Sequence, residues 1–156
     1  MQIPVPLLPK AVRWAAVGSL AAFILYSSLV TVPETVVDQT QPDGLPLHLW
    51  RHVVAYFTLA CALAYATDHW ELPRLHNALV VIGLAALYGA LMEFGQVFVP
   101  HRTDFLITDV AANTFGASGV GIWYLLRPYL ILKPIPELIE QLRHPSLVSH
   151  RTAVQQ

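Results

Sequence analysis

The stretch NALVVIGLAALYGALMEFGQVF, residues 77–98, decides the fold class of this chain. Its length matches the roughly 20 helical residues that cross a hydrocarbon core of about 30 Å. Near its end it nevertheless carries Glu93 and Gln96. An ionisable side chain at membrane depth is costly unless it meets a partner or water, so by default it marks a functional site. The stretch therefore predicts a membrane-spanning helix with a polar site at one end.

The composition points to an integral membrane protein. Of the 156 residues, 55% are hydrophobic and 12% are charged, and the mean hydropathy is positive. Such a chain is too apolar for an ordinary soluble domain. The basic residues are scattered, which argues against a nucleic-acid-binding surface. The single cysteine, Cys61, lies in an apolar run and cannot form a disulfide within the chain.

Four apolar stretches are predicted to cross the membrane, at 14–32, 50–67, 77–98 and 109–127. Proline or charged residues follow each of them and favour helix ends there. The first stretch is longer than the apolar region of a signal peptide and precedes no small-residue cleavage site, so we expect a retained anchor. The fold class predicted is all-α, a polytopic membrane protein with four transmembrane helices in the plasma membrane.

The basic residues predict the orientation of these helices, because short loops rich in Lys and Arg face the cytoplasm. With four spans, one side carries Lys10, Arg13, Arg74, Arg127, Lys133, Arg143 and Arg151, and the other carries Arg51 and Arg102. Both termini are therefore expected in the cytoplasm. We expect a transmembrane domain over 1–133 and a partly disordered cytoplasmic tail over 134–156. The tail includes an amphipathic stretch, 136–142, suited to the membrane surface.

This topology brings polar residues from three helix ends to the outer side. Residues spaced by three or four positions share one face of a helix. Such pairs occur at the start of the second span, the end of the third and the start of the fourth, with an arginine in the last outer loop. The candidate ligand-binding residues are His52, Tyr56, Glu93, Gln96, Arg102, Asp109 and Asn113.

Several of these residues form a pattern that resembles the VanZ-like family of small membrane proteins, named for an accessory protein of teicoplanin resistance. The pattern runs from about 48 to 121 and comprises His52, Tyr56-Phe57, Tyr88-Gly89, Glu93, Gln96, Pro100, Arg102, Asp109, Asn113 and Gly116. It departs from the family at His48-Leu49, where an Asp-Lys pair is frequent. The resemblance implies a membrane location and a link to the cell envelope or to antibiotic resistance, without an established reaction.

Each polar residue also has a structural interpretation. Asp109, near a helix start, is suited to accept free backbone N–H groups as a cap. Asn113 is suited to hydrogen-bond between helices. Glu93 and Arg102 are suited to a structural ion pair. Small residues permit close helix packing, which is the role predicted for Gly89, Gly116, Gly119 and Gly121.

Three classes of function remain open from the sequence. The first is recognition of an envelope molecule, a lipid-linked precursor or a lipopeptide, in an outward-facing polar pocket, with membrane lipids as further partners. The second is an intramembrane enzyme acting on a lipid headgroup, with Glu93 or His52 as acid and base. The third is a structural subunit of a larger membrane complex. We expect no cofactor and no metal, although His48 and His52 have a spacing that, with Glu93 or Asp109, suits zinc or magnesium.

Overall fold

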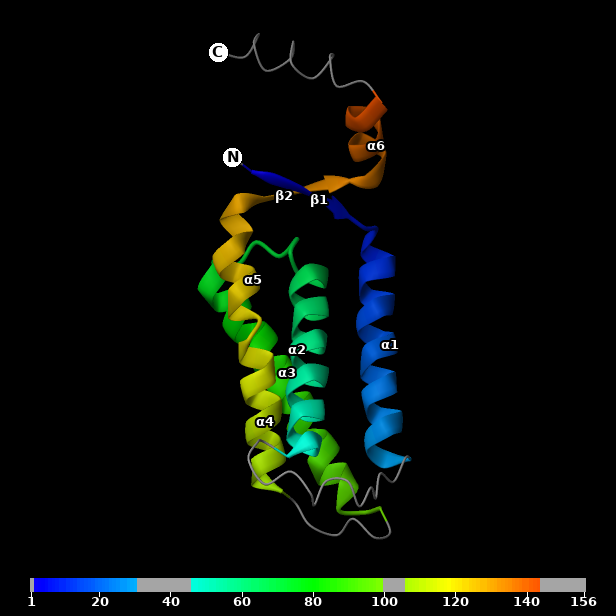
Figure 1. Cartoon of the computed structure of the whole chain (residues 1–156), viewed down its shortest axis with the longest axis vertical. Helices are drawn as coiled ribbons and strands as arrows, with labels where there is room; N and C mark the ends of the chain where they lie inside the picture. The colour runs from blue at the N-terminus through cyan, green and yellow to red at the C-terminus, as the bar shows by residue number, and fades with distance from the viewer. Residues whose placement is uncertain (1, 31–45, 100–105, 144–156) are drawn as a thin grey trace.

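The computed structural model describes residues 2–30, 46–99 and 106–143, and it is mostly helical (Figure 1). Its three long helices are α1 (Lys10–Leu29), α2 (Leu47–Ala66) and α3 (Arg74–Gln96). Each is long and apolar enough to cross a membrane. In Figure 1 α2 stands between α1 and α4, while α3 crosses behind α2 and also contacts α1. These features indicate a multi-pass membrane protein.

The three long helices begin three or four residues before the predicted spans, immediately after a proline. Pro9, Pro46 and Pro73 occupy the N-cap positions of α1, α2 and α3. Proline fits there because the N–H that it lacks would have no partner within the helix. Apolar content alone places the ends of a helix less well, since the first turns of α1 and α3 include charged residues, Lys10 and Arg74 among them.

The faces of the helices have the distribution that a lipid environment favours. The buried face of α3 repeats at helical spacing and uses small or medium side chains such as Ala78, Val81, Ala85 and Gly89. Its large apolar side chains, among them Leu87, are exposed. Large exposed apolar surfaces are uncommon on soluble monomers. The exposed apolar side chains of α3 are therefore suited to contact with lipid.

The fourth predicted span, 109–127, is not one continuous helix. It comprises α4 (Ile107–Ser118) and α5 (Gly121–Leu126), which follow one another along the side of the bundle (Figure 1). Between them the backbone bonds tighten to three-residue turns, including Gly119 N to Gly116 O and Val120 N to Ala117 O, both 3.1 Å. Glycine has low helix propensity, so a glycine-rich segment yields readily to this tighter geometry.

The prediction of an all-α fold was wrong in one respect, because the segments that flank the helices form a small sheet. Strand β1 (Ile3–Leu7) pairs in parallel with β2 (Leu130–Pro134), with Ile3 opposite Leu130. Pro4 and Pro6 lie within β1, and proline is tolerated in an edge strand because only one side of the strand must pair. A short 3₁₀ helix, η2 (Arg127–Tyr129), leads into β2. The pairing joins segments far apart in sequence, so no local periodicity predicts it.

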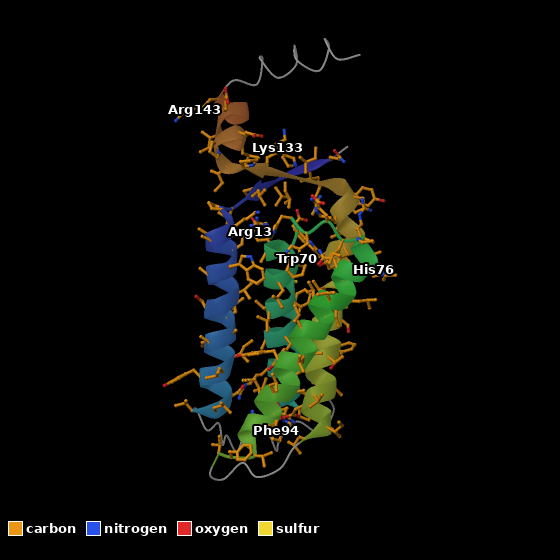
Figure 2. The ribbon with its side chains drawn as sticks, turned by 180° about the vertical axis from the view of Figure 1, so that it is seen from behind. Arg13, Trp70, His76, Phe94, Lys133 and Arg143 are labelled. Atoms are coloured by element: carbon orange, nitrogen blue, oxygen red, sulfur yellow. The ribbon has the colours of Figure 1, made fainter. Side chains whose placement is uncertain are left out.

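Beyond β2 the chain continues as α6 (Ile135–Arg143), which covers the predicted amphipathic stretch 136–142. It contacts both strands, so β1, β2 and α6 lie together at one end of the bundle. Figure 2 shows Lys133 and Arg143 at this end and Phe94 of α3 at the opposite end. We call the two ends the sheet end and the loop end. The rest of the predicted tail, 144–156, lies outside the described residues.

Arg13 and Tyr65 join the sheet end to the bundle. Arg13 is 4% exposed, and its guanidinium donates to the backbone oxygen of Tyr65 over 2.8 Å while lying over the Tyr65 ring. That oxygen is one of the last carbonyls of α2, which have no partner within the helix. The Tyr65 hydroxyl donates to Pro6 O (2.7 Å) and accepts from Leu8 N (2.8 Å). Arg13 thus acts in packing as well as adding to the basic charge of the sheet end.

A second link connects the end of α2 with the end of α5. The Arg127 guanidinium donates to both carboxylate oxygens of Asp68, over 2.6 and 3.0 Å, and also donates to Leu130 O over 2.9 Å. Two parallel bonds of this kind are the strongest geometry for an arginine and a carboxylate. The link therefore holds β2 against the helices.

Replacing Arg127 with alanine is expected to lower the free energy of unfolding by about 1–2 kcal/mol, because the half-buried Asp68 carboxylate then loses a charged donor. Removing Asp68 as well should recover part of the loss. The measurement is thermal unfolding of the single and double variants in detergent, with exposed Arg74→Ala as the control. Equal unfolding temperatures for Arg127→Ala and Arg74→Ala would show that the Asp68 link contributes nothing.

Candidate functional site

The loop end of the bundle holds four polar residues from three helices: His52 of α2, Glu93 of α3, and Asp109 and Asn113 of α4. We call these four the polar cluster. Ligand atoms of the histidine and the two carboxylates all lie within 4.8 Å of one another. Glu93 is 1% exposed and Asn113 is fully buried. Each residue stands within two turns of a helix end, because α2 and α4 begin, and α3 ends, at the same end of the bundle.

His52 lies at the centre of the polar cluster. Its Nδ1 is 2.8 Å from Asn113 Oδ1 and 3.8 Å from Glu93 Oε1. Its Nε2 is 3.4 Å from Asp109 Oδ2. An amide oxygen can only accept, so this contact requires that Nδ1 carry a proton. One imidazole is therefore shared between two carboxylates and one amide.

Asp109 does not act as the helix cap that one interpretation of the sequence proposed. The N-cap residue of α4 is Leu106, three residues before Asp109, and it makes no side-chain capping bond. The Asp109 carboxylate faces His52 and also lies 4.0 Å from His48 Nε2, with the Thr108 hydroxyl 3.4 Å away. Its place in the first turn still lets the positive helix end stabilise its charge.

The remaining candidate residues of α2 and α3 are buried on the same two helices, within one turn of the members of the polar cluster. Tyr56 is buried one turn further along α2, and Gln96 is buried as the last residue of α3. Because Glu93 and Gln96 share the buried face of α3, neither faces lipid. Arg102 lies outside the described residues, and with it the predicted Glu93–Arg102 ion pair.

The predicted packing glycines differ in what surrounds them. A Cβ added at Gly116 would meet the backbone of Val53, at 2.8 Å from its Cα, so α2 and α4 are in backbone contact there. Added carbons at Gly89 and Gly119 would meet the side chains of Asn113 (2.8 Å) and Phe57 (2.7 Å). At Gly121 no described atom lies within 4 Å, so the expected close approach is not found at that position. Gly89 thus makes room for the Asn113 amide of the polar cluster.

Sequence reasoning gave little weight to His48 and missed the Asp68–Arg127 link. His48 is the second residue of α2, so it shares a helical face with His52 after all. Its side chain is 42% exposed and that of His52 is 19% exposed, against 8% for Asp109. The two histidines therefore form the solvent-accessible edge of the polar cluster. The Asp68–Arg127 link could have been predicted, because the two residues carry opposite charges and lie at the ends of the second and fourth predicted spans, on the same side of the membrane.

The fold and the polar cluster define the class of this molecule as a small multi-pass helical membrane protein with a buried polar site at one end. The sequence profile of the VanZ/LLP1 family matches residues 11–127, well over half of the chain. The chain therefore belongs to the VanZ/LLP1 family. No curated protein and no solved structure gives a significant match.

Proposed function

We propose that this protein binds the polar headgroup of a cell-envelope molecule, lipid-linked or glycopeptide-like, at the polar cluster. The observation that carries the proposal is the convergence of two buried carboxylates, a buried amide and a shared histidine at one end of the bundle. Carboxylates accept hydrogen bonds from the hydroxyl, amide and ammonium groups that sugar and peptide headgroups supply. The role is accessory to the cell envelope or to antibiotic resistance such as that to teicoplanin.

The distribution of charge supports an outward-facing polar cluster. Arg13, Lys133 and Arg143 belong to the sheet end (Figure 2), and both β1 and α6 lie there. Because basic residues favour the cytoplasmic side, we place the sheet end and both termini in the cytoplasm and the polar cluster at the outer face of the plasma membrane. A molecule in the outer leaflet would then reach the polar cluster through its accessible edge at His48 and His52.

The contacts of His52 favour binding over acid–base catalysis. A general base needs a nitrogen directed at the proton that it removes. Here Nδ1 contacts Asn113 and Nε2 faces Asp109, so both ring nitrogens are directed at protein groups. The alternative, an intramembrane enzyme that uses Glu93 and His52 as acid and base, requires one of these contacts to open.

Native mass spectrometry of the purified full-length protein tests the proposal. We expect a lipid or glycolipid to copurify with the wild type, and Glu93→Gln to reduce its occupancy by at least about tenfold, because the neutral amide loses the charge-assisted bonds. His76→Gln, at an exposed site near the start of α3, is the matched control and should retain the ligand. Asp109→Asn serves as a second variant in case Glu93→Gln does not fold.

Each other outcome identifies a competing class. Equal lipid occupancy in wild type, Glu93→Gln and Asp109→Asn would overturn the binding proposal and leave a structural subunit of a larger membrane complex. A bound molecule that is converted to a new mass during incubation would instead identify an enzyme.

A further inference from the structure

We propose that His52, Glu93 and Asp109, with His48 at the edge, form a binding site for a divalent transition-metal cation of the Zn²⁺ class. Each of the three residues offers one ligand atom, and these three atoms all lie within 4.8 Å of one another. The cation would occupy the same polar cluster as the headgroup. The proposal shares this cluster with the proposed function, and the experiment below distinguishes the failure of one from the failure of the other.

The distance between His52 and Asp109 suits a small cation. Zinc bonds to nitrogen and oxygen of about 2.0–2.2 Å, arranged as a tetrahedron, separate neighbouring ligand atoms by roughly 3.3–3.6 Å. His52 Nε2 and Asp109 Oδ2 are 3.4 Å apart. His48 Nε2 is 4.0 Å from the other Asp109 oxygen, and the His48 side chain is half-exposed. The Asp109 carboxylate therefore lies between two imidazoles.

The orientation of the His52 ring provides a further argument. Asn113 Oδ1 accepts a hydrogen bond from His52 Nδ1, 2.8 Å away, and this leaves Nε2 as the ring nitrogen that faces the Asp109 carboxylate. A metal-binding histidine typically donates its other ring N–H to a carbonyl or carboxylate, which fixes the ring orientation. Asn113 has this relation to His52.

The position of the Asn113 side chain is fixed by its surroundings. Its side chain is fully buried, and Gly89 leaves no space for a Cβ beside its amide, 2.8 Å from Nδ2. Nδ2 is buried and has no hydrogen-bond partner within the described residues. A buried amide group without a partner costs free energy, so the orientation that turns Oδ1 toward His52 needs a compensating gain. Binding of a cation by His52 supplies that gain.

The donor set selects the kind of cation. Imidazole nitrogen suits Zn²⁺ and its neighbours, whereas Mg²⁺ and Ca²⁺ prefer oxygen ligands alone. The carboxylates of Glu93 and Asp109 bring negative charge when ionised, and a divalent cation would neutralise it in a site where isolated charge is expensive. The half-exposed His48 side chain offers the ion a path from solvent.

The test uses the full-length protein in detergent, delipidated and treated with EDTA. Co²⁺ should give the visible absorption bands of a nitrogen- and oxygen-bound ion, and Zn²⁺ should displace it with one ion bound per chain. Asp109→Asn and His52→Gln should each weaken Zn²⁺ binding by at least about a hundredfold, and Asn113→Leu by about 10- to 100-fold as the loss of an orienting partner. His76→Gln is the control and should bind as the wild type does.

The Co²⁺ spectrum and the Zn²⁺ titration of the wild type test the proposal even if a variant fails to fold. His48→Gln is a further variant, at a half-exposed position. Absence of saturable Zn²⁺ binding to the wild type would overturn it. Unchanged binding in both Asp109→Asn and His52→Gln, or binding of Mg²⁺ in preference to Zn²⁺, would do the same. Lipid occupancy measured on the EDTA-treated protein shows separately whether the headgroup proposal holds without the cation.

Discussion

Replacement of Gly116 by valine is expected to destabilise the bundle by about 3 kcal/mol or more, the largest effect of any single substitution considered. A Cβ at this position would lie 2.8 Å from Val53 Cα and 2.9 Å from its carbonyl carbon. These are backbone atoms, so no side-chain rotation relieves the clash, and α2 and α4 must move apart. Overpacking typically costs about 1–3 kcal/mol even where side chains can adjust. The separation would also widen the polar cluster, whose members lie on these two helices and α3.

Thermal unfolding in detergent, followed by helical circular dichroism, measures this effect. Gly83→Val is the matched control, because Gly83 is an exposed glycine of α3 with no atom within 4 Å of an added Cβ. We expect Gly83→Val to unfold close to the wild-type temperature. If Gly116→Val unfolds together with Gly83→Val, the backbone contact between α2 and α4 does not exist in the protein.

Replacement of Asn113 by leucine is expected to cost about 2–3 kcal/mol, at the upper end for a buried group left without its partner. Leucine branches at the same carbon as asparagine, so it fills the space beside Gly89 with little change of shape. It cannot accept the proton of His52 Nδ1, which now lies 2.8 Å from an amide oxygen. The cost therefore measures the hydrogen bond to His52, less the gain from removing the unpartnered Nδ2, rather than a cavity.

Asn77→Leu is the control for this substitution. Asn77 is also a buried asparagine, but its Oδ1 accepts no hydrogen bond from the described residues. Replacing it should be neutral or slightly stabilising, because an unsatisfied polar atom is removed from the interior. The same unfolding assay compares the two variants. A loss for Asn113→Leu no greater than that for Asn77→Leu would mean that the His52–Asn113 bond adds no stability.

The candidate site was partly predictable because its residues obey helical spacing. Glu93 and Gln96 share the buried face of α3 through their three-residue spacing, and Asp109 and Asn113 share a face of α4 through their four-residue spacing. The alternation of helix direction then places α2, α3 and α4 with the correct ends together. What spacing does not give is which groups touch. The shared position of His52 between Glu93 and Asp109 depends on the rotation of each helix about its axis.

The apolar runs by themselves predicted a multi-pass membrane protein with four spans, and the first three of these are the long helices α1, α2 and α3. Length and hydrophobicity are local properties of a segment, so they can be judged from the sequence alone. Only the tertiary structure decided the pairing of β1 with β2 and the link from Asp68 to Arg127 across 59 positions of sequence. Each depends on contacts between distant residues or on how closely two backbones approach. Such contacts arise only when the helices have packed, so no pattern within one segment contains them.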